Sequence, residues 1–368
     1  MTSFADIGKK EALRRLYEGS PFKQTEPSAH KVFLEGVDFN LIYFPLKHLG
    51  YKAVTAVTGE LYSQLRHPVS LSVVLGVSAK LDYPQIEEIW SGVSAAAKEH
   101  GYKEVSLDLR PSRNGLCISV AASGERLKLT EVRRPKAQSK DLLCVSGRLG
   151  AAYLGMRVME RGLERFEKGD RDNKELEQYR MQVGAYLKPE LDPGIVGKLE
   201  EEEIIPSAGV LITDGLADAV KRIAVKTGFG AKVYADRIPF EGNSFELGRK
   251  LDLDPISAAM NGGEDYQLLF VVPILKLDKF RHDFQTFDII GHLAQKEVGT
   301  VLVTPEGVEL PLRAQGWKED ENEYLSNICV YEKNLCYHCC DAYACICCKR
   351  PERPRRTSRK YLRRKQNY

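Results

Sequence analysis

The sequence lacks an apolar run near the roughly 18 residues that a membrane-spanning helix needs. Residues 1–16 are charged and contain no apolar signal core. Before Cys329 there are only two cysteines, Cys117 and Cys144, and both lie in apolar stretches. These absences argue against a membrane protein and against a disulfide-stabilised secreted scaffold. We therefore expect a soluble, cytoplasmic body with two buried thiols in a reducing compartment.

Charge is distributed unevenly along the chain. The formal net charge is +3, yet residues 349–368 hold ten Lys or Arg and one acid, Glu352. Residues 1–348 therefore carry 44 basic and 50 acidic side chains, a net charge of −6. A mildly acidic body does not favour nucleic-acid binding, which needs a basic surface. The length of 368 residues predicts roughly two domains, each with its own core.

The hydrophobic pattern of the first half predicts an α+β layer. Residues 71–77 form a continuous apolar run typical of a buried strand, and apolar residues recur at helical spacing from Pro84 to Gly101. Residues 104–109 and 116–122 read as a hairpin that turns at Asn114-Gly115. A strand, a helix and two strands in this order indicate one sheet with helices on a single face. A helix is also predicted at 4–17 and a loop at 19–31.

The second half shows the same mixture of strands and helices. The polar stretch 133–140 contains Pro135 and is a reasonable boundary. We therefore expect an N-terminal domain at 1–137, a C-terminal domain at 138–320 and a separate tail at 321–368. Strands are predicted at 141–146, 210–212, 231–234, 267–272, 289–293 and 299–303, with helices from 151 to 166 and 216 to 228.

The stretch Asn261–Tyr266 is the most distinctive in the chain. Gly262 and Gly263 permit positive φ angles and a close approach to the backbone. Glu264 and Asp265 then place two carboxylates at the mouth of an apolar strand. A ligand site and a plain strand-entry turn both fit this pattern.

Five motifs together resemble a known family. They are LEGVDF at 34–39, PLKHLGYKA at 45–53, VSGRLGAAYLG at 145–155, TDGLAD at 213–218 and GGEDY at 262–266. Their sequence and order resemble thiamine-monophosphate kinase, within the aminoimidazole-ribonucleotide-synthetase-like superfamily, over roughly residues 4–320. The resemblance implies a two-domain α+β subunit, each domain a mixed sheet with helices on one face. It also implies a homodimer formed by the N-terminal domains.

The activity implied by the resemblance is a phosphoryl transfer. ATP would be the co-substrate and Mg²⁺ the cofactor, and thiamine phosphate would be converted to thiamine diphosphate. Such chemistry needs carboxylates that hold Mg²⁺ on phosphate oxygens. A second hypothesis stays open: a non-catalytic relative that binds nucleotide or thiamine phosphate, or serves as a dimeric partner.

The resemblance places only part of the expected metal site in this chain. Three metal-binding acids of the family are kept, at Glu60, Asp108 and Asp214. Other metal positions fall on Lys31 and Leu211. A lysine ~4 Å from a cation would cost on the order of 4 kcal/mol at an effective dielectric of ~20, unless it contacts phosphate itself. Asp108 could instead face water, and Asp214 could simply cap a helix.

Substrate positions of the family are better kept. Glu264 matches a substrate residue, and Asp38 stands where the family has a substrate histidine. Trp317 matches an aromatic residue that contacts thiamine, since a cationic thiazolium pairs well with an indole ring. Arg134 and Thr213 fall at nucleotide positions. Trp317 could also be a core anchor, and Arg134 a solvated linker charge.

The tail combines seven cysteines, between Cys329 and Cys348, with a basic end. The ligand types for zinc are present in two groups, Cys336, Cys339 and Cys340 with His338, and Cys345, Cys347 and Cys348. Only a few residues separate the two groups, far fewer than a zinc ribbon or finger needs. A metal-binding knuckle with nucleic-acid affinity and an unstructured appendage both remain open.

Overall fold

The structure is a computed structural model that describes residues 4–21, 29–126, 134–172, 174–284 and 287–317. Contacts divide the chain into two units, Pro21–Asp320 and a second unit of Met1–Ser20 with Glu321–Tyr368. In the second unit the described element is α1 (Phe4–Glu18), at the position predicted for a helix. The predicted zinc ligands and basic end lie outside the described residues. All other elements belong to Pro21–Asp320.

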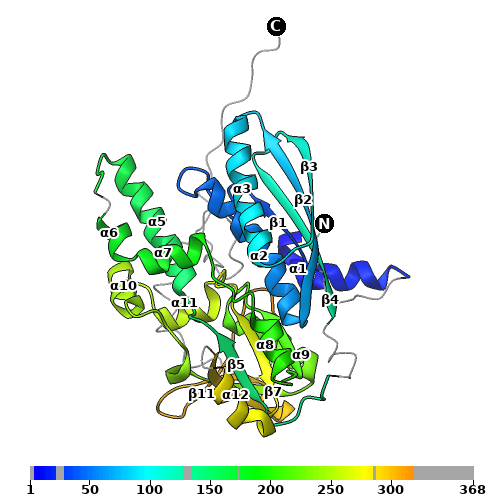
Figure 1. The fold of residues 1–368 in the computed structure, drawn as a ribbon. Coiled ribbons are helices and arrows are strands. Elements are labelled where there is room, and N and C mark those ends of the chain that lie inside the picture. Colours follow the sequence, from blue (N-terminus) through cyan, green and yellow to red (C-terminus); the bar gives the residue numbers. More distant parts are fainter. Residues whose placement is uncertain (1–3, 22–28, 127–133, 173, 285–286, 318–368) are drawn as a thin grey trace, which may run out of the picture. The chain divides into compact units, whose positions relative to one another are not determined.

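The first half of this unit forms a four-stranded mixed sheet in the order β1-β4-β2-β3. β2 and β3 are parallel and the other neighbours are antiparallel. The helices α2 and α3 lie side by side on one face of this sheet (Figure 1). The element bounds are β1 (His30–Leu34), α2 (Leu46–Ser63), β2 (Arg66–Ser78), α3 (Tyr83–Glu99), β3 (Glu104–Ser112) and β4 (Cys117–Arg126).

The position of β1 differs from the prediction for residues 19–31. The loop predicted to run from Gly19 to Lys31 ends early, because His30 and Lys31 already pair with Ala121 and Val120 of β4. Their polar side chains hide the strand from a pattern based on hydrophobicity. The strand brings Lys31 next to the buried Phe33.

Local sequence explains how α2 and α3 come together. The Asp82 carboxylate accepts a hydrogen bond from the Gln85 backbone N–H in a capping box, with a proline in the first turn. Glycines then allow the two backbones to touch. A Cβ atom at Gly50 would lie 2.1 Å from the Ile89 carbonyl oxygen, and one at Gly92 would lie 1.9 Å from the Lys47 carbonyl oxygen. Only glycine fits at either position.

The second half forms a seven-stranded sheet in the order β11-β10-β7-β9-β5-β8-β6. β10 and β7 are parallel, and all other neighbours are antiparallel. One face packs on α9. The strand bounds are β5 (Leu142–Ser146), β6 (Ala208–Leu211), β7 (Gly230–Tyr234), β8 (Leu268–Val272), β9 (Phe287–Ala294), β10 (Thr300–Val303) and β11 (Glu309–Pro311).

Several helices surround this second sheet. The pair α5 and α7 pack against each other, and α9 covers a core that includes Leu143, Val145 and Val220. The helix bounds are α5 (Ala151–Glu167), α6 (Lys174–Gln178), α7 (Arg180–Leu187), α8 (Ile195–Glu201), α9 (Leu216–Thr227), α10 (Ser244–Leu251), α11 (Pro255–Asn261) and α12 (Leu277–Asp283), with short 3₁₀ turns η1 (Ala235–Arg237), η2 (Ile274–Lys276) and η3 (Lys296–Val298).

Helix α2 connects the two sheets. Fifteen of its eighteen residues are buried, because it packs on β2 and β4 on one side and on β6 and β8 on the other. One continuous core therefore runs from Leu71 and Val73 of the first sheet to Leu268 and Phe270 of the second. Two mixed sheets with packed helices confirm the predicted α+β class. The predicted burial of the thiols holds for Cys144, while Cys117 is half-buried.

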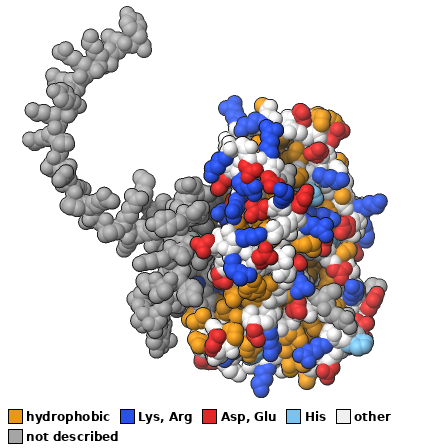
Figure 2. Space-filling view, turned by 90° about the vertical axis from the view of Figure 1, so that its left-hand side faces the viewer, with side chains coloured by type: hydrophobic (Ala, Val, Ile, Leu, Met, Phe, Trp, Pro, Cys, Tyr) orange, Lys and Arg blue, Asp and Glu red, His pale blue; other side chains and the backbone are white. Residues whose placement is uncertain are grey.

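The described surface mixes charges of both signs. Figure 2 shows basic and acidic side chains interspersed over one face. None of the described helices combines the length and the hydrophobicity that a bilayer crossing needs.

Candidate functional site

The Asn261–Tyr266 segment is held in an unusual backbone conformation. Gly263, Glu264 and Tyr266 have φ angles of 75°, 63° and 49°. The Glu264 backbone N–H donates to the Thr213 carbonyl oxygen at 2.8 Å, and a Cβ atom at Gly263 would lie 2.8 Å from that same oxygen. Left-handed conformations at non-glycine residues cost of order 1–3 kcal/mol each and cluster at functional sites. The segment is therefore more than a plain strand-entry turn.

Glu264 pairs with a lysine from the middle of α2. Its carboxylate lies 2.7 Å from the Lys52 Nζ atom, and the Lys52 side chain is only 1% exposed. The ammonium also lies 4.0 Å from the centre of the Tyr186 ring and 5.2 Å from that of Phe44. Burial lowers the pKa of Lys52, and the Glu264 carboxylate opposes this shift. An aromatic cage thus holds a buried cation directly beneath Glu264.

Asp265, unlike Glu264, bonds to the N-terminus of α5. Its buried carboxylate accepts the backbone N–H groups of Gly150 at 2.9 Å and Ala152 at 3.2 Å. These are orphan donors at a helix N-terminus, where a negative charge is favourable. Burial nevertheless raises the pKa of Asp265 to about 7. Gly147 and Gly150 have φ angles of 65° and 75°, as expected if they shape this strand-to-helix turn.

Tyr266 reaches a second lysine. Its buried hydroxyl accepts a hydrogen bond from Lys31 Nζ at 2.8 Å. Burial raises the pKa of Tyr266 well above its ordinary value, and the carboxylates of Glu264, Asp38 and Asp214 raise it further. Three carboxylates from distant parts of the chain therefore lie within electrostatic reach of one hydroxyl. Lys31 brings a positive charge to the same place.

Asp38 and Asp214 complete this neighbourhood. The half-buried Asp38 accepts the Leu34 backbone N–H at 2.8 Å, and burial raises the pKa of its carboxyl. The exposed Asp214 accepts a hydrogen bond from the Thr213 hydroxyl at 2.7 Å. The N-cap of α9 is Gly215, without a side-chain capping bond, so Asp214 does not take the alternative role of a cap.

The other expected metal acids have different surroundings. Asp108 is exposed on β3 and pairs with Arg110, whose Nε atom lies 3.2 Å from its carboxylate. Glu60 is half-buried on α2. Beside it, a Cβ atom at Gly59 would lie 2.4 Å from Leu211 Cδ1, so an apolar contact fills this crossing of α2 and β6.

The remaining expected residues are anchored in the fold. Arg134 donates from Nη2 to the Ser63 carbonyl oxygen at 3.3 Å, near the end of α2. The half-buried Trp317 donates from Nε1 to Asp218 of α9 at 2.8 Å, and Lys221 Nζ lies 5.6 Å from the centre of its ring. The Trp317 indole ring therefore already has the Lys221 ammonium beside it.

Metal donors can be tested against this geometry. In the parts of the chain that the structure describes, no three His, Cys, Asp or Glu side chains group so as to hold a metal ion. Lys31 and Lys52 supply positive charge at the Asn261–Tyr266 segment instead. These donors do not fit a protein-built magnesium cage. A magnesium ion brought by ATP would have to take phosphate and water oxygens as ligands.

Sequence reasoning missed the two lysine contacts. A signal existed for Lys52, which is a single charge within the apolar run Leu49–Val57 and must either leave the core or find a partner there. The partner itself, 212 residues away, leaves no trace in local pattern.

Comparisons with known proteins point mainly to thiamine-monophosphate kinases. No protein-family model matches the chain. A thiamine-monophosphate kinase of Pyrococcus horikoshii is 26% identical over 273 residues, which is 73% of this chain and 78% of that protein. A crystal structure of the Aquifex aeolicus thiamine monophosphate kinase matches with a TM-score of 0.66 at 23% identity, covering 84% of this chain and 99% of that one. The chain is thus similar to thiamine-monophosphate kinases over 73% of its length.

A third comparison concerns ligands. The structure described as AaThiL complexed with AMPPCP and TMP matches with a TM-score of 0.65 at 21% identity, covering 84% of this chain and 97% of that one. Hydrogenase maturation proteins share the fold as well. This breadth is expected of the aminoimidazole-ribonucleotide-synthetase-like fold, since fold alone does not define activity.

Proposed function

We propose that this thiamine-monophosphate kinase relative transfers the γ-phosphoryl group of ATP to thiamine phosphate, which forms thiamine diphosphate. One observation carries the proposal. Residues from four motifs that are far apart in sequence act on one another: Lys52 pairs with Glu264, and the carboxylates of Glu264, Asp38 and Asp214 raise the pKa of Tyr266. The names of the relatives and the AMPPCP and TMP of AaThiL support the choice of substrates.

The transfer itself needs positioning more than covalent help. A phosphate oxygen of thiamine phosphate forms a bond to the γ-phosphorus of ATP. The bond from that phosphorus to the β–γ bridging oxygen breaks, and ADP leaves with the electron pair. We assign Lys31 to hold phosphate oxygens by charge-assisted hydrogen bonds, since its ammonium is half-buried at this point. Lys52 holds Glu264 in place.

The expected site residues take their roles within this proposal. Glu264 and Asp38 orient thiamine phosphate, and Trp317 meets the thiazolium if the Lys221 ammonium moves off its ring. Arg134 and Thr213 contact the nucleotide. The acids kept for Mg²⁺ are Glu60, Asp108 and Asp214, and because the described donors do not group in threes, no step above depends on them.

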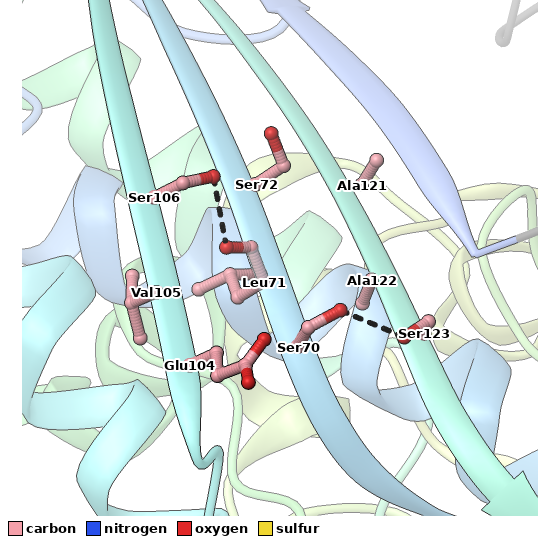
Figure 3. A pocket seen from close by; sticks show the side chains of 9 residues that line it. All are labelled: Ser70, Leu71, Ser72, Glu104, Val105, Ser106, Ala121, Ala122 and Ser123. Carbon is pink, nitrogen blue, oxygen red and sulfur yellow. Dashed lines mark hydrogen bonds between the residues drawn. The ribbon is translucent and has the colours of Figure 1, made fainter.

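The open face of the four-stranded sheet suits the proposed homodimer. Small side chains line a shallow hollow of about 430 Å³ there, among them Ser72, Ser106 and Ala121 (Figure 3). Ser70 and Ser123 share a hydrogen bond of 2.7 Å across β2 and β4. A flat face of short side chains can approach a second copy closely. Ala121→Arg should convert a dimer to a monomer in light scattering, and a mass unchanged from the wild type would contradict this interface.

The activity is tested directly with the full chain. Purified protein is incubated with ATP, MgCl₂ and thiamine phosphate, and thiamine diphosphate is measured by chromatography. We expect product, and at least a tenfold loss of kcat/KM in Glu264→Gln, which removes the charge that orients substrate. Lys168→Ala, at the exposed C-cap residue of α5, is the control and should keep full activity. Absence of product in the wild type would overturn the proposal.

A non-catalytic relative is the second candidate. It is favoured by the Arg110 partner of Asp108 and by the Leu211 contact at Gly59. In that case calorimetry would detect binding of thiamine phosphate or ATP, while no thiamine diphosphate would form at any Mg²⁺ concentration.

A further inference from the structure

A second pocket lies at the other end of the seven-stranded sheet from Glu264. It has a volume of about 340 Å³ and is built from the start of β5, the end of β7 and the middle of β9, together with η1, η2 and α12. β5 begins at this pocket with Leu142 and ends with Ser146, which bonds to the start of β8 near Glu264. At about 3.3 Å per residue, these two ends of β5 are roughly 13 Å apart. The pocket is therefore separate from the proposed kinase site.

Three cationic side chains line this pocket. They are Lys140, just before β5, Arg237 of η1 and Arg281 of α12, and no Asp or Glu is among the lining residues. Within the part of the chain that the structure describes, none of the three makes an ion pair. A further lysine near the pocket, Lys232, is already paired with Glu309. Uncompensated like charges at one opening create a positive potential that attracts anions.

The pKa of His292 reflects this positive potential. Burial lowers the pKa of its imidazole, and Lys232, Arg237 and Lys140 lower it further. Positive groups from three different parts of the fold therefore act on one ring. The Nδ1 atom of His292 lies 3.4 Å from the Tyr234 hydroxyl, which leaves a polar pair on the pocket wall.

The remaining wall is aromatic and aliphatic. The Tyr234 ring lies 5.8 Å from the His292 ring at an interplanar angle of 31°, and the Arg237 guanidinium lies 4.8 Å from the centre of the Tyr234 ring. Leu142, Leu277 and Ile289 supply aliphatic surface. Pockets with an apolar lining and a few convergent polar groups are typical of small-molecule sites, and the volume is at the lower end of their range.

We propose that this pocket, lined by Lys140, Tyr234, Arg237, Arg281 and His292, binds a small organic phosphate that carries a planar ring. The phosphate lies between the two guanidinium groups and the lysine, where bidentate contacts are available. The ring lies against Tyr234 and the aliphatic wall. Binding here does not depend on the proposed kinase activity, because no residue of the pocket belongs to that site.

Phenyl phosphate is a suitable probe, with phenol and inorganic phosphate as its two halves. Each is titrated into the full chain while the His292 ring signals are followed by NMR. Loss of those signals in His292→Gln assigns them among the seven histidines of the chain. We expect saturable shifts with phenyl phosphate and a higher imidazole pKa in the complex, since a bound anion stabilises the charged ring. Phenol and inorganic phosphate should bind at least tenfold more weakly.

Arg237→Ala/Arg281→Ala tests the cations, and both side chains are exposed, so the fold should tolerate the change. We expect a loss of affinity of at least about tenfold, which corresponds to 1.4 kcal/mol. Lys168→Ala lowers the net charge at a distant surface and should bind like the wild type. The proposal is overturned by the absence of a saturable His292 shift, by equal affinity in the double variant and the control, or by phenol binding as tightly as phenyl phosphate.

Discussion

The Asn261–Tyr266 segment and two of the expected metal acids, Asp108 and Asp214, differ in what their side chains do for the fold. Glu264, Asp265 and Tyr266 each bond to a different element, namely α2, α5 and β1. Asp108 and Asp214 are exposed and bond only to a near neighbour in sequence. Loss of a residue of the first kind therefore costs stability as well as function. Loss of a residue of the second kind costs function alone.

This difference offers a physical account of where the chain has diverged. Lys31 and Leu211, at two positions where the resemblance implies a metal ligand, fit the packing of the fold, and Leu211 lies against Gly59. A comparable change at Asp265 would leave two helix N–H groups without an acceptor. The Asn261–Tyr266 segment tolerates fewer substitutions because α2, α5 and β1 all bond to it.

Asp265→Asn should give the largest loss of stability. At pH 5 the protonated Asp265 carboxyl can still accept on both oxygens, whereas the NH₂ group of asparagine cannot accept and would face one of the two backbone donors. We expect the free energy of unfolding to fall by about 2–3 kcal/mol at pH 5 in urea titrations. Asp214→Asn, the exposed counterpart, should change it by less than ~0.5 kcal/mol.

The stability difference between the wild type and Asp265→Asn should depend on pH. Burial raises the pKa of Asp265 to about 7, above the value near 3.8 of an unperturbed carboxyl. Its contribution to stability is therefore complete below about pH 4 and is lost as the pH rises through about 7. The gap between wild type and Asp265→Asn should shrink from pH 5 to pH 8. A gap that does not change with pH would contradict the raised pKa.

Lys52→Met should have the next largest effect. Methionine fills the space of the aliphatic stem but leaves Glu264 without its partner. Breaking a fully buried pair costs 3–5 kcal/mol, and because the Glu264 side chain is 23% exposed we expect about 2 kcal/mol. The double variant Lys52→Met/Glu264→Gln should recover part of this loss in a double-mutant cycle. Strict additivity would show that the pair does not couple α2 to the segment.

Lys31→Asp tests whether position 31 faces the Mg²⁺ and phosphates of ATP. The variant loses one hydrogen bond to Tyr266, which should cost about 1 kcal/mol of stability. It also replaces a cation by a magnesium-type ligand. In calorimetric titrations with ATP present, we expect Mg²⁺ to bind at least tenfold more tightly than to the wild type. Equal or weaker Mg²⁺ binding would show that Lys31 does not face the phosphates.

Asp108→Asn should have the smallest effect on the fold. Exposed ion pairs contribute about 0–1 kcal/mol, so the midpoint of thermal unfolding should stay within about 2 °C of the wild type. If Asp108 serves the proposed kinase, kcat/KM should still fall at least tenfold. A clear loss of stability would remove the contrast between the two regions.

Local patterns were enough for much of the fold. Asn114-Gly115 marked the turn between β3 and β4, but the predicted hairpin was wrong, because β2 lies between these strands and pairs with both of them. Apolar runs marked the strands at 231–234 and 267–272. Periodicity works there because burial acts on one face of each element. It failed at His30 and Lys31, since these strand residues are polar and owe their conformation to pairing with β4.

The candidate site was less accessible from local pattern. The sequence singled out Glu264 and its neighbours, because glycines and carboxylates beside an apolar strand are unusual. It did not reveal the Gly59–Leu211 contact, which depends on how α2 crosses β6. The pocket at Arg237 and Arg281 was also missed, since its residues come from six elements and form no motif.

Most elements of this protein, its α+β class and its resemblance to thiamine-monophosphate kinases could be read from the chain, because they depend on short-range periodicity and on motifs in a fixed order. Only the tertiary structure decided which charges meet. Lys52 pairs with Glu264 and Lys31 bonds to Tyr266 because α2 packs between the two sheets. Three cations line one pocket because of the order of the strands. Partners so far apart in the chain are selected by the geometry of the whole core, which no local stretch contains.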